Sequence, residues 1–240
     1  VSFQVGDLAR FPLLSQNDEK LEQLVEQAIE LARTDSKEAE TTYDFIAPPA
    51  WTTGGKDVTA RHAKLREVEA AIDDEVYQLY GLSDDDRAAI EAQLGENTSE
   101  SENSDDNSND QNETSLTPED LAKQWISYAV GIVLGRFQPG VEGALGYGDF
   151  DEETGAKLRQ LTDRDGAACL DEGHQDDLVA KVYTALELMV GEEEVDNLLD
   201  AGCPGSGETT ARLRKYLGKK FFQEHVKQYR KRPVYWLLES

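Results

Sequence analysis

The sequence predicts a mainly α-helical protein: a helical spacer region with isolated short strands at both chain ends. Three observations favour this class. Apolar residues recur at three- and four-residue spacing in most ordered stretches. Residues typical of helix starts and stops flank those stretches. The alternation typical of a strand is visible only near residues 3–5 and 233–240. The 240 residues, 38% of them hydrophobic, suffice for one large domain or two small ones.

The N-terminal half contains three predicted helices. Ser15 and Ser83 are suitable N-cap residues, and Gly81 is a typical helix stop. In the second helix the apolar residues form one narrow stripe, as in a helical hairpin. The predicted helices cover about 15–33, 59–80 and 83–94.

The segment between the first two helices is expected to be irregular. Pro48 and Pro49 are incompatible with the interior of a helix or a sheet. Its aromatic residues Tyr43, Phe45 and Trp51 are expected to anchor the segment to a core rather than to bind a ligand.

Residues 96–115 contain no apolar side chain: seven are acidic and thirteen are Ser, Thr, Asn or Gln. Such a segment cannot bury enough surface to offset the entropy lost on ordering. We therefore expect a disordered acidic linker over 95–116, which divides the chain into parts covering 1–94 and 117–240.

Order is predicted to resume at Thr117, a good N-cap that precedes Pro118 at the first helical position. Small residues then recur every four positions, at Ser127, Gly131 and Gly135, which predicts a face where another helix packs closely. Further helices are expected at 151–162, 175–190, 192–200 and 208–230.

The chain is strongly acidic, with 49 Asp and Glu against 24 Lys and Arg and a net charge of −25. Two interpretations compete: an acidic partner-binding protein, or a halophilic protein whose carboxylates keep it hydrated in molar salt. Because the acids are spread through almost every polar segment, we favour the second. The acidity then says little about function.

Composition also bears on location. Two cysteines, Cys169 and Cys203, do not make a disulfide framework or a metal site. No apolar run approaches the roughly 20 residues that a membrane span needs, and the first residues do not resemble a signal peptide. We expect a cytoplasmic protein without a membrane partner.

The stretch "GCPGSGETT" (202–210) has the spacing of a nucleotide-binding P-loop, but Glu208 occupies the position of the phosphate-binding lysine. The residues before it are predicted to be helical, whereas a P-loop follows a strand. We expect a helix stop at Gly202 and a flexible turn, with Thr209 or Thr210 capping the next helix. The three histidines share no ligand spacing, so no catalytic, cofactor-binding or metal-binding residue is predicted.

The strongest local signal is a basic segment from Ala211 to Arg232, in which Glu224 is the only acid. The segment carries +8, and the rest of the chain −33. Two interpretations fit: contact with the phosphates of DNA, or docking on the chain's own acidic surface. The candidate DNA-binding residues are Arg212, Arg214, Lys215, Lys219, Lys220, Lys227, Arg230, Lys231 and Arg232.

Five further stretches are distinctive: "ISYAVGIVLGRF" (126–137), "RKYLGKKFFQEHVKQYRKRPVYWLLES" (214–240), "FQVGDLARFPLL" (3–14), "ETTYDF" (40–45) and "YGL" (80–82). In sequence and in order they resemble the PglX-type adenine-specific DNA methyltransferases of bacteriophage-exclusion (BREX) systems. The resemblance implies a segment after the catalytic domain, so that 1–94 holds the end of a methyltransferase-like domain and a helical hairpin.

The family implies S-adenosylmethionine as cofactor of the full-length enzyme. This chain lacks the glycine-rich cofactor loop and the Asn-Pro-Pro-Tyr or Asp-Pro-Pro-Tyr motif, so we expect it to bind no cofactor itself. The expected function is a noncatalytic helical piece that links catalytic and DNA-recognition parts and binds DNA weakly and nonspecifically. The alternative is a stand-alone helical protein-interaction module without a role on DNA.

Overall fold

The computed structural model describes residues 18–100, 116–144, 153–162 and 166–234. The predicted helical class is confirmed: in these ranges the secondary structure is helical apart from one isolated bridge between Cys169 and Asp177. The strand predicted near residue 3 lies outside the described residues, as does most of the strand predicted over 233–240. The chain forms two compact units, Val1–Ala32 with His62–Glu113 and Arg33–Arg61 with Thr114–Ser240.

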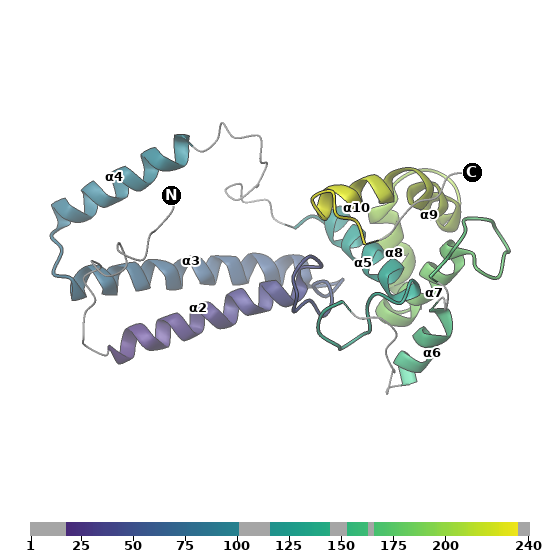
Figure 1. Ribbon diagram of the computed structural model, residues 1–240, viewed down its shortest axis with the longest axis horizontal. Helices are drawn as coiled ribbons and strands as arrows, with labels where there is room; N and C mark the ends of the chain where they lie inside the picture. Colours follow the sequence, from purple (N-terminus) through teal and green to yellow (C-terminus); the bar gives the residue numbers. More distant parts are fainter. Residues whose placement is uncertain (1–17, 101–115, 145–152, 163–165, 235–240) are drawn as a thin grey trace. The chain divides into compact units, whose positions relative to one another are not determined.

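The first unit contains most of α2 (Glu19–Glu38) and α3 (Gly54–Leu79), which lie side by side, and α4 (Asp84–Glu100) (Figure 1). α2 has no buried residue. Val68 and Glu75 are the buried residues in the described part of this unit. Because so little apolar surface is removed from water, this unit has only a thin core.

α2 differs from its prediction at both ends. Ser15 lies outside the described residues, and the helix begins at Glu19, where the Oδ1 atom of Asp18 accepts the N–H of Leu21 at 2.9 Å. Asp18 is therefore the N-cap. The helix continues beyond Arg33 to Glu38 because its last turn is bound by tertiary contacts, among them an ion pair from Arg61 to Asp35 at 2.6 Å.

α3 begins at Gly54, five residues before the predicted start at Thr59. Two consecutive glycines disfavour a helix, but a Cβ atom on Gly54 would lie 2.6 Å from Cβ of Pro49, so only glycine fits there. The predicted stop at Gly81 is confirmed. With a φ of 63°, Gly81 donates its N–H to Gln78, and Leu82 donates to Tyr77, both at 3.0 Å.

Ser83 caps α4 as predicted. Its hydroxyl accepts the N–H of Asp86 at 3.3 Å, and the Asp86 carboxylate accepts the N–H of Ser83 at 3.1 Å. α4 continues to Glu100, beyond Leu94, so residues 95–100 of the predicted linker are helical. Residues 101–115 lie outside the described residues, and there the linker remains a prediction.

In the second unit α5 (Pro118–Val133) lies among the other helices (Figure 1). It starts as predicted: Thr117 is the N-cap, and Thr117 and Asp120 form a reciprocal capping box. Every residue from Ile126 to Val133 is buried, so this stretch has no solvent-facing side. The helices packed around it are α6 (Glu153–Leu161), α7 (Leu178–Val190) and α8 (Glu192–Gly202).

The small-residue stripe of α5 has two roles. Ser127 and Gly131 are buried within the helix, as close packing requires. Gly135 instead lies beyond the helix end with a φ of 69°. It donates its N–H to Ile132 at 3.0 Å while Arg136 donates to Gly131 at 2.6 Å, a Schellman motif. The prediction that Gly135 belongs to a helix-packing face is therefore wrong.

The segment after α2 is anchored to the core of the second unit, as predicted for two of its three aromatic residues. Phe45 is 1% exposed and packs edge-on against Tyr128 and Phe137 at centroid distances of 5.5 and 5.1 Å. Trp51 packs on the same core and donates its indole N–H to Glu194 at 3.1 Å. Tyr43 is 88% exposed, so its predicted anchoring role is wrong.

Candidate nucleic-acid interface

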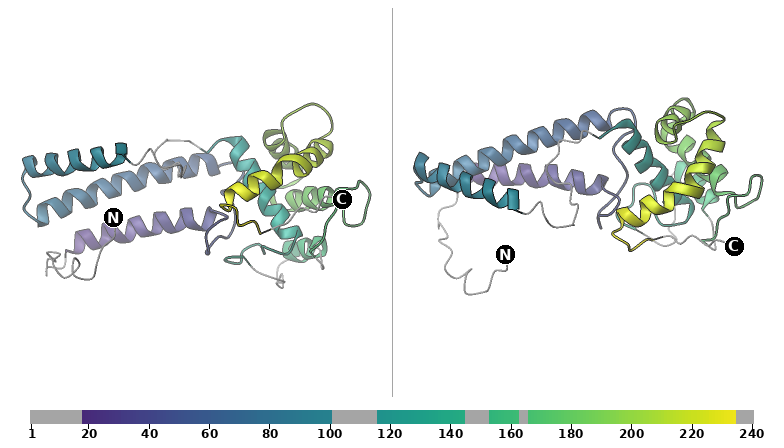
Figure 2. Two further views of the ribbon diagram at one scale, coloured as in Figure 1. Left: turned by 45° about the horizontal axis from the view of Figure 1, so that its top comes forward. Right: turned by 90° about the horizontal axis from the view of Figure 1, so that it is seen from above.

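The basic segment forms one rod of three elements beside α5 (Figure 2): α9 (Thr209–Tyr216), the π-helical turn η2 (Leu217–Phe221) and α10 (Phe222–Gln228). Its buried residues are Leu213, Tyr216, Leu217, Phe221 and His225, and four of them (Leu213, Leu217, Phe221 and His225) recur every four positions. An α-helix repeats every 3.6 residues, so a strict four-residue spacing would drift off the buried face. The π turn, with its longer i→i+5 bonds, holds the extra residue and keeps the four on one side.

The loop before the rod is not a P-loop. It follows α8, a helix that ends at Gly202, and not a strand. Glu208 occupies the N-cap of α9 without a side-chain capping bond, so the prediction that Thr209 or Thr210 caps this helix is wrong. Both threonines lie within its first turn.

Arg214 is engaged inside the unit. Its guanidinium donates to both carboxylate oxygens of Asp177, at 3.0 and 2.8 Å, and to the carbonyl of Leu170. The Asp177 side chain is 5% exposed and also caps α7 by accepting the N–H of Val179. The hydrogen bonds from Arg214 lower the pKa of Asp177 below its ordinary value, against the opposing effect of burial.

Arg212 is engaged in a similar way. It forms an ion pair with Asp200 and donates to the carbonyl oxygen of Cys203 at 2.9 Å. Its side chain is 13% exposed. For Arg212 and Arg214 the intramolecular interpretation therefore applies, and both guanidinium groups hold the rod to neighbouring segments.

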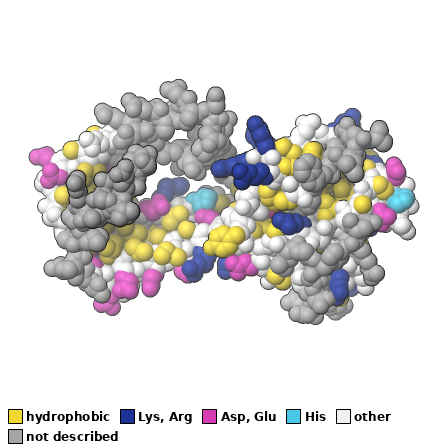
Figure 3. Space-filling model, in the orientation of Figure 1, with side chains coloured by type: hydrophobic (Ala, Val, Ile, Leu, Met, Phe, Trp, Pro, Cys, Tyr) yellow, Lys and Arg dark blue, Asp and Glu magenta, His cyan; other side chains and the backbone are white. Residues whose placement is uncertain are grey.

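The other seven candidate cations are exposed, and none of them forms an ion pair with the described part of the chain. They fall into two groups, one along the rod and one at its end and in the turn that follows it. The groove lysines are Lys215, Lys219 and Lys220. The turn cations are Lys227, Arg230, Lys231 and Arg232. Figure 3 shows Lys and Arg side chains gathered over the end of α10.

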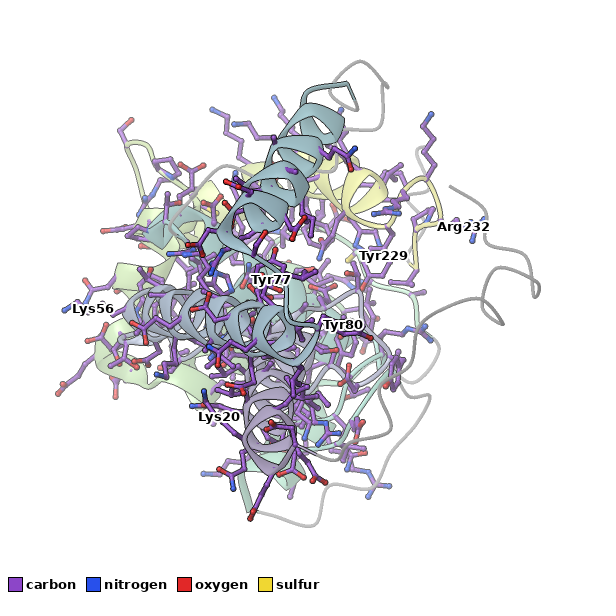
Figure 4. All side chains as sticks on the ribbon, turned by 90° about the vertical axis from the view of Figure 1, so that its left-hand side faces the viewer. Lys20, Lys56, Tyr77, Tyr80, Tyr229 and Arg232 are labelled. Carbon is purple, nitrogen blue, oxygen red and sulfur yellow. The ribbon has the colours of Figure 1, made fainter. Side chains whose placement is uncertain are left out.

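The turn cations are held on an unusual backbone. Arg230 and Lys231 have φ angles of 49° and 66°, in the left-handed region that costs non-glycine residues about 1 kcal/mol each. The turn is closed by the N–H of Lys231, which donates to Val226 at 2.8 Å. Arg232 points outward from this turn (Figure 4). The strained backbone thus presents three successive cations to solvent.

A buried carboxyl group fixes the base of this turn. Oε1 of Glu40 accepts the hydroxyl groups of Tyr229 at 2.9 Å and Ser127 at 3.0 Å, and so joins the segment after α2 to α10 and α5. Burial raises the pKa of Glu40 despite these hydrogen bonds. This contact is not predictable from the sequence, because one glutamate among 49 acidic residues does not stand out.

His225 is the second buried polar group beside the turn, at 1% exposure. Its Nε2 accepts the N–H of Val234 at 3.1 Å, and its ring lies 4.6 Å from that of Tyr229. Burial lowers the pKa of His225 to about 4, so the ring is neutral at physiological pH.

The groove lysines line a hollow of about 540 Å³, here called the groove. Its walls are the start of α5, the loop after α8, and the rod. A second hollow of about 400 Å³ lies against the same rod, and Lys215 and Lys219 line both. The groove is lined by Glu119, Lys123, Gly202, Cys203, Pro204, Gly205, Ser206, Ala211, Arg212, Lys215, Tyr216, Lys219 and Lys220.

Cys203, in the wall of the groove, is a buried free thiol, and burial raises its pKa to about 11. It is therefore protonated and unreactive at neutral pH. Among the described residues no three His, Cys, Asp or Glu side chains are grouped as a metal site requires. Within the same ranges no helix combines the length and the apolar character needed to cross a membrane.

No family model matches the chain. Over 100% of its length it is 30% identical to the adenine-specific methyltransferase BrxX of Escherichia coli O9:H4 (strain HS) and covers 22% of that protein. It is 25% identical, again over its whole length, to the adenine-specific methyltransferase PglX of Lacticaseibacillus casei (strain Zhang), of which it covers 21%.

These matches confirm the resemblance found in the sequence. The whole chain is homologous to a segment of the adenine-specific methyltransferases BrxX and PglX. It spans about a fifth of the length of these curated relatives.

Proposed function

We propose that this chain is a noncatalytic helical part of an adenine-specific DNA methyltransferase of a BREX phage-defence system. In this role it links the catalytic part to the DNA-recognition part and touches DNA through the basic segment. Its partners are DNA, bound weakly and without sequence preference, and the other parts of the enzyme. S-adenosylmethionine is bound by the catalytic part, because this chain lacks both methyltransferase motifs.

One observation carries the proposed contact with DNA. A chain with a net charge of −25 leaves seven exposed cations of the rod and of the turn that follows it without ion pairs to the described residues. Exposed, unpaired cations can bind the phosphates of DNA, and this binding is favourable because each neutralised phosphate releases a condensed counterion. Homology to two adenine-specific methyltransferases supplies the context in which such a contact is useful.

The test is duplex binding measured by fluorescence anisotropy over a range of KCl concentrations. We expect weak, sequence-independent affinity that falls steeply with salt. Changing all seven exposed cations to glutamine should abolish binding at low salt, while circular dichroism reports an unchanged helix content. If this variant binds as the wild type does, the DNA role of the rod is refuted.

The second candidate is a helical protein-interaction module without a role on DNA. α2 favours it, because its side chains at Val25 and Ile29 are 38% and 48% exposed and none of its residues is buried. An apolar helix face of this kind suits a protein partner. The same binding experiment separates the two functions, since the module requires no affinity for duplex DNA.

A further inference from the structure

We propose that the groove is a binding site for a single phosphate group of the DNA backbone, held by Lys215, Lys219 and Lys220. This inference rests on the proposed contact with DNA and deepens it: it assigns a defined phosphate site to three of the seven exposed cations. The turn cations then add only general attraction.

The charge inside the groove is the first argument. Glu119 is the one carboxylate among its described lining residues, and it already accepts from Lys123 at 3.0 Å. Arg212 is paired with Asp200. With these ion pairs formed, the ammonium groups of the three groove lysines are the charges that remain without a partner in the described lining of the groove. An ammonium group is a compact point charge that binds phosphate without a fixed fork geometry.

The π turn is the second argument, because it determines where the three lysines lie. Lys219 follows Lys215 by four residues and Lys220 follows it by five. In a regular α-helix the position five residues on has turned well away from the first. In η2 each turn holds an additional residue, so Lys220 stays on the wall that Lys215 and Lys219 line. π turns are rare and frequently mark functional sites.

Preorganisation is the third argument. Arg212 fixes the rod to the loop through the Cys203 carbonyl, and Arg214 fixes it to Asp177. The Tyr216 hydroxyl donates to Glu224 at 2.7 Å across the π turn. Because the backbone beneath the lysines is held in this way, a phosphate entering the groove orders only lysine side chains, which lowers the entropic cost of binding.

The neighbouring hollow shows why the groove is the better site. Glu172 and Glu208 line that hollow together with Lys215 and Lys219, and Arg214 in its wall is already paired. Two carboxylates there repel an anion. An anion that approaches the ridge between the two hollows is therefore drawn toward the groove.

The experiment compares two variants of equal charge. One replaces the groove lysines (K215Q/K219Q/K220Q), and the other replaces three turn cations (K227Q/R230Q/K231Q). Each loses three exposed positive charges. We measure the affinity for a labelled duplex by anisotropy at several KCl concentrations, and the folding of each variant by circular dichroism.

We expect the groove variant to lose about tenfold in affinity at low salt and its salt slope to fall by about one. The turn variant should lose clearly less. An equal loss in both variants overturns the phosphate site but leaves the DNA role intact. Undiminished binding by both overturns the site and the DNA role of these residues together.

A variant on the opposite wall makes the test independent of the lysines. Ser206 is exposed on the loop and lines the groove, so S206E places a carboxylate opposite the ammonium groups. We expect it to weaken duplex binding as the groove variant does. Ser206 lies outside the rod, so unchanged affinity in S206E would contradict the site whatever the rod variants do.

A small phosphate compound is the other possible source of the anion. Sodium pyrophosphate is therefore titrated at constant ionic strength into the wild type and the groove variant. We expect it to bind the wild type only weakly and to compete with the duplex. Micromolar pyrophosphate binding that the groove variant loses, together with unchanged duplex affinity, would assign the groove to a free phosphate compound and overturn the proposal.

Discussion

Glu40 joins three segments of the second unit through one carboxylate oxygen, which accepts from Ser127 and Tyr229. Its other oxygen, Oε2, is buried without a hydrogen-bond partner among the described residues. A buried carboxylate with half of its acceptors unused is costly when ionised. This cost is why burial outweighs the hydrogen bonds and raises its pKa.

The raised pKa predicts how Glu40 affects stability. The folded state holds the proton more tightly than the unfolded state, so the free energy of unfolding falls as pH rises from the unfolded value through the folded one. The variant E40Q cannot ionise and lacks this decline. We expect E40Q to melt at a higher temperature than the wild type at pH 8 and to lose that advantage near pH 4, measured by thermal denaturation monitored by circular dichroism. An advantage that does not depend on pH would contradict this explanation.

His225 predicts the opposite dependence. Its pKa is lowered to about 4 from the ordinary 6.5, so the unfolded state binds the proton more readily. Its contribution is fully present above about pH 6.5 and is lost as pH falls toward 4. Protonation also removes the Nε2 acceptor for Val234.

The variant H225Q should therefore be less stable than the wild type at pH 7, with a melting temperature that changes less between pH 7 and pH 4. The E40Q protein retains His225 and serves as the control, because its melting temperature should still fall between pH 7 and pH 4. If the melting temperature of H225Q changes between pH 7 and pH 4 as steeply as that of the wild type, another group is responsible for the pH dependence.

Among the elements, close contact between α5 and α8 depends on one glycine. A Cβ atom on Gly202 would lie 2.9 Å from Cδ1 of Ile126 and 3.0 Å from Cβ of Ala122. Both neighbours are 0% exposed and cannot withdraw into solvent. Gly218, in the π turn, is exposed, and a Cβ there would meet only the end of the Leu170 side chain, at 3.2 Å.

The same substitution should consequently have opposite effects at the two positions. G202A is expected to destabilise the protein by about 1–3 kcal/mol through overpacking. G218A is expected to be neutral or to stabilise it by up to about 1 kcal/mol, because alanine lowers the entropy of the unfolded chain. Urea denaturation measures both, and a comparable loss in the two variants would contradict the close α5–α8 contact.

Helix signals in the sequence located the elements well where the cause was local. Thr117 and Pro118 at the start of α5, Ser83 before α4 and Gly81 after α3 were found because each acts on its own neighbours. The sequence does not predict the start of α3 at Gly54, because two glycines disfavour a helix and the close approach of Pro49 that requires glycine there is a tertiary contact. The sequence could not show that contact.

In the candidate site, too, the local features are predictable from the sequence and the tertiary contacts are not. The basic segment is visible in the sequence, but nothing there separates Arg212 and Arg214 from the lysines. Their partners Asp200 and Asp177 are supplied by other helices and loops. The groove is not visible in the sequence either, because Glu119 and Lys123 enter it from α5, far from the rod along the chain. The π turn left one trace in the sequence: the four-residue spacing from Leu213 to His225.

For the molecule as a whole, the net charge of −25 means that added salt should affect DNA binding and folding stability in opposite directions. The proposed attraction between the basic segment and DNA should weaken as salt screens it and as counterion release loses its advantage. Repulsion among the 49 acidic residues weakens for the same reason, and this favours the folded state. A halophilic origin, which the spread of the acids predicts, requires the second effect to continue at high salt.

Between about 0.05 and 1 M KCl we expect the melting temperature to rise while duplex affinity falls, because the Debye length shrinks from above 10 Å to about 3 Å. Replacing KCl with an equal osmolality of sucrose should not reproduce the loss of DNA binding, which isolates the ionic contribution. The ion pair of Arg214 with Asp177 is largely shielded from solvent and is screened less than a surface pair, so it should keep the rod in place over the whole range. A melting temperature that falls with KCl would mean that attraction between charges outweighs repulsion in this protein, and the halophilic interpretation of its acidity would fail.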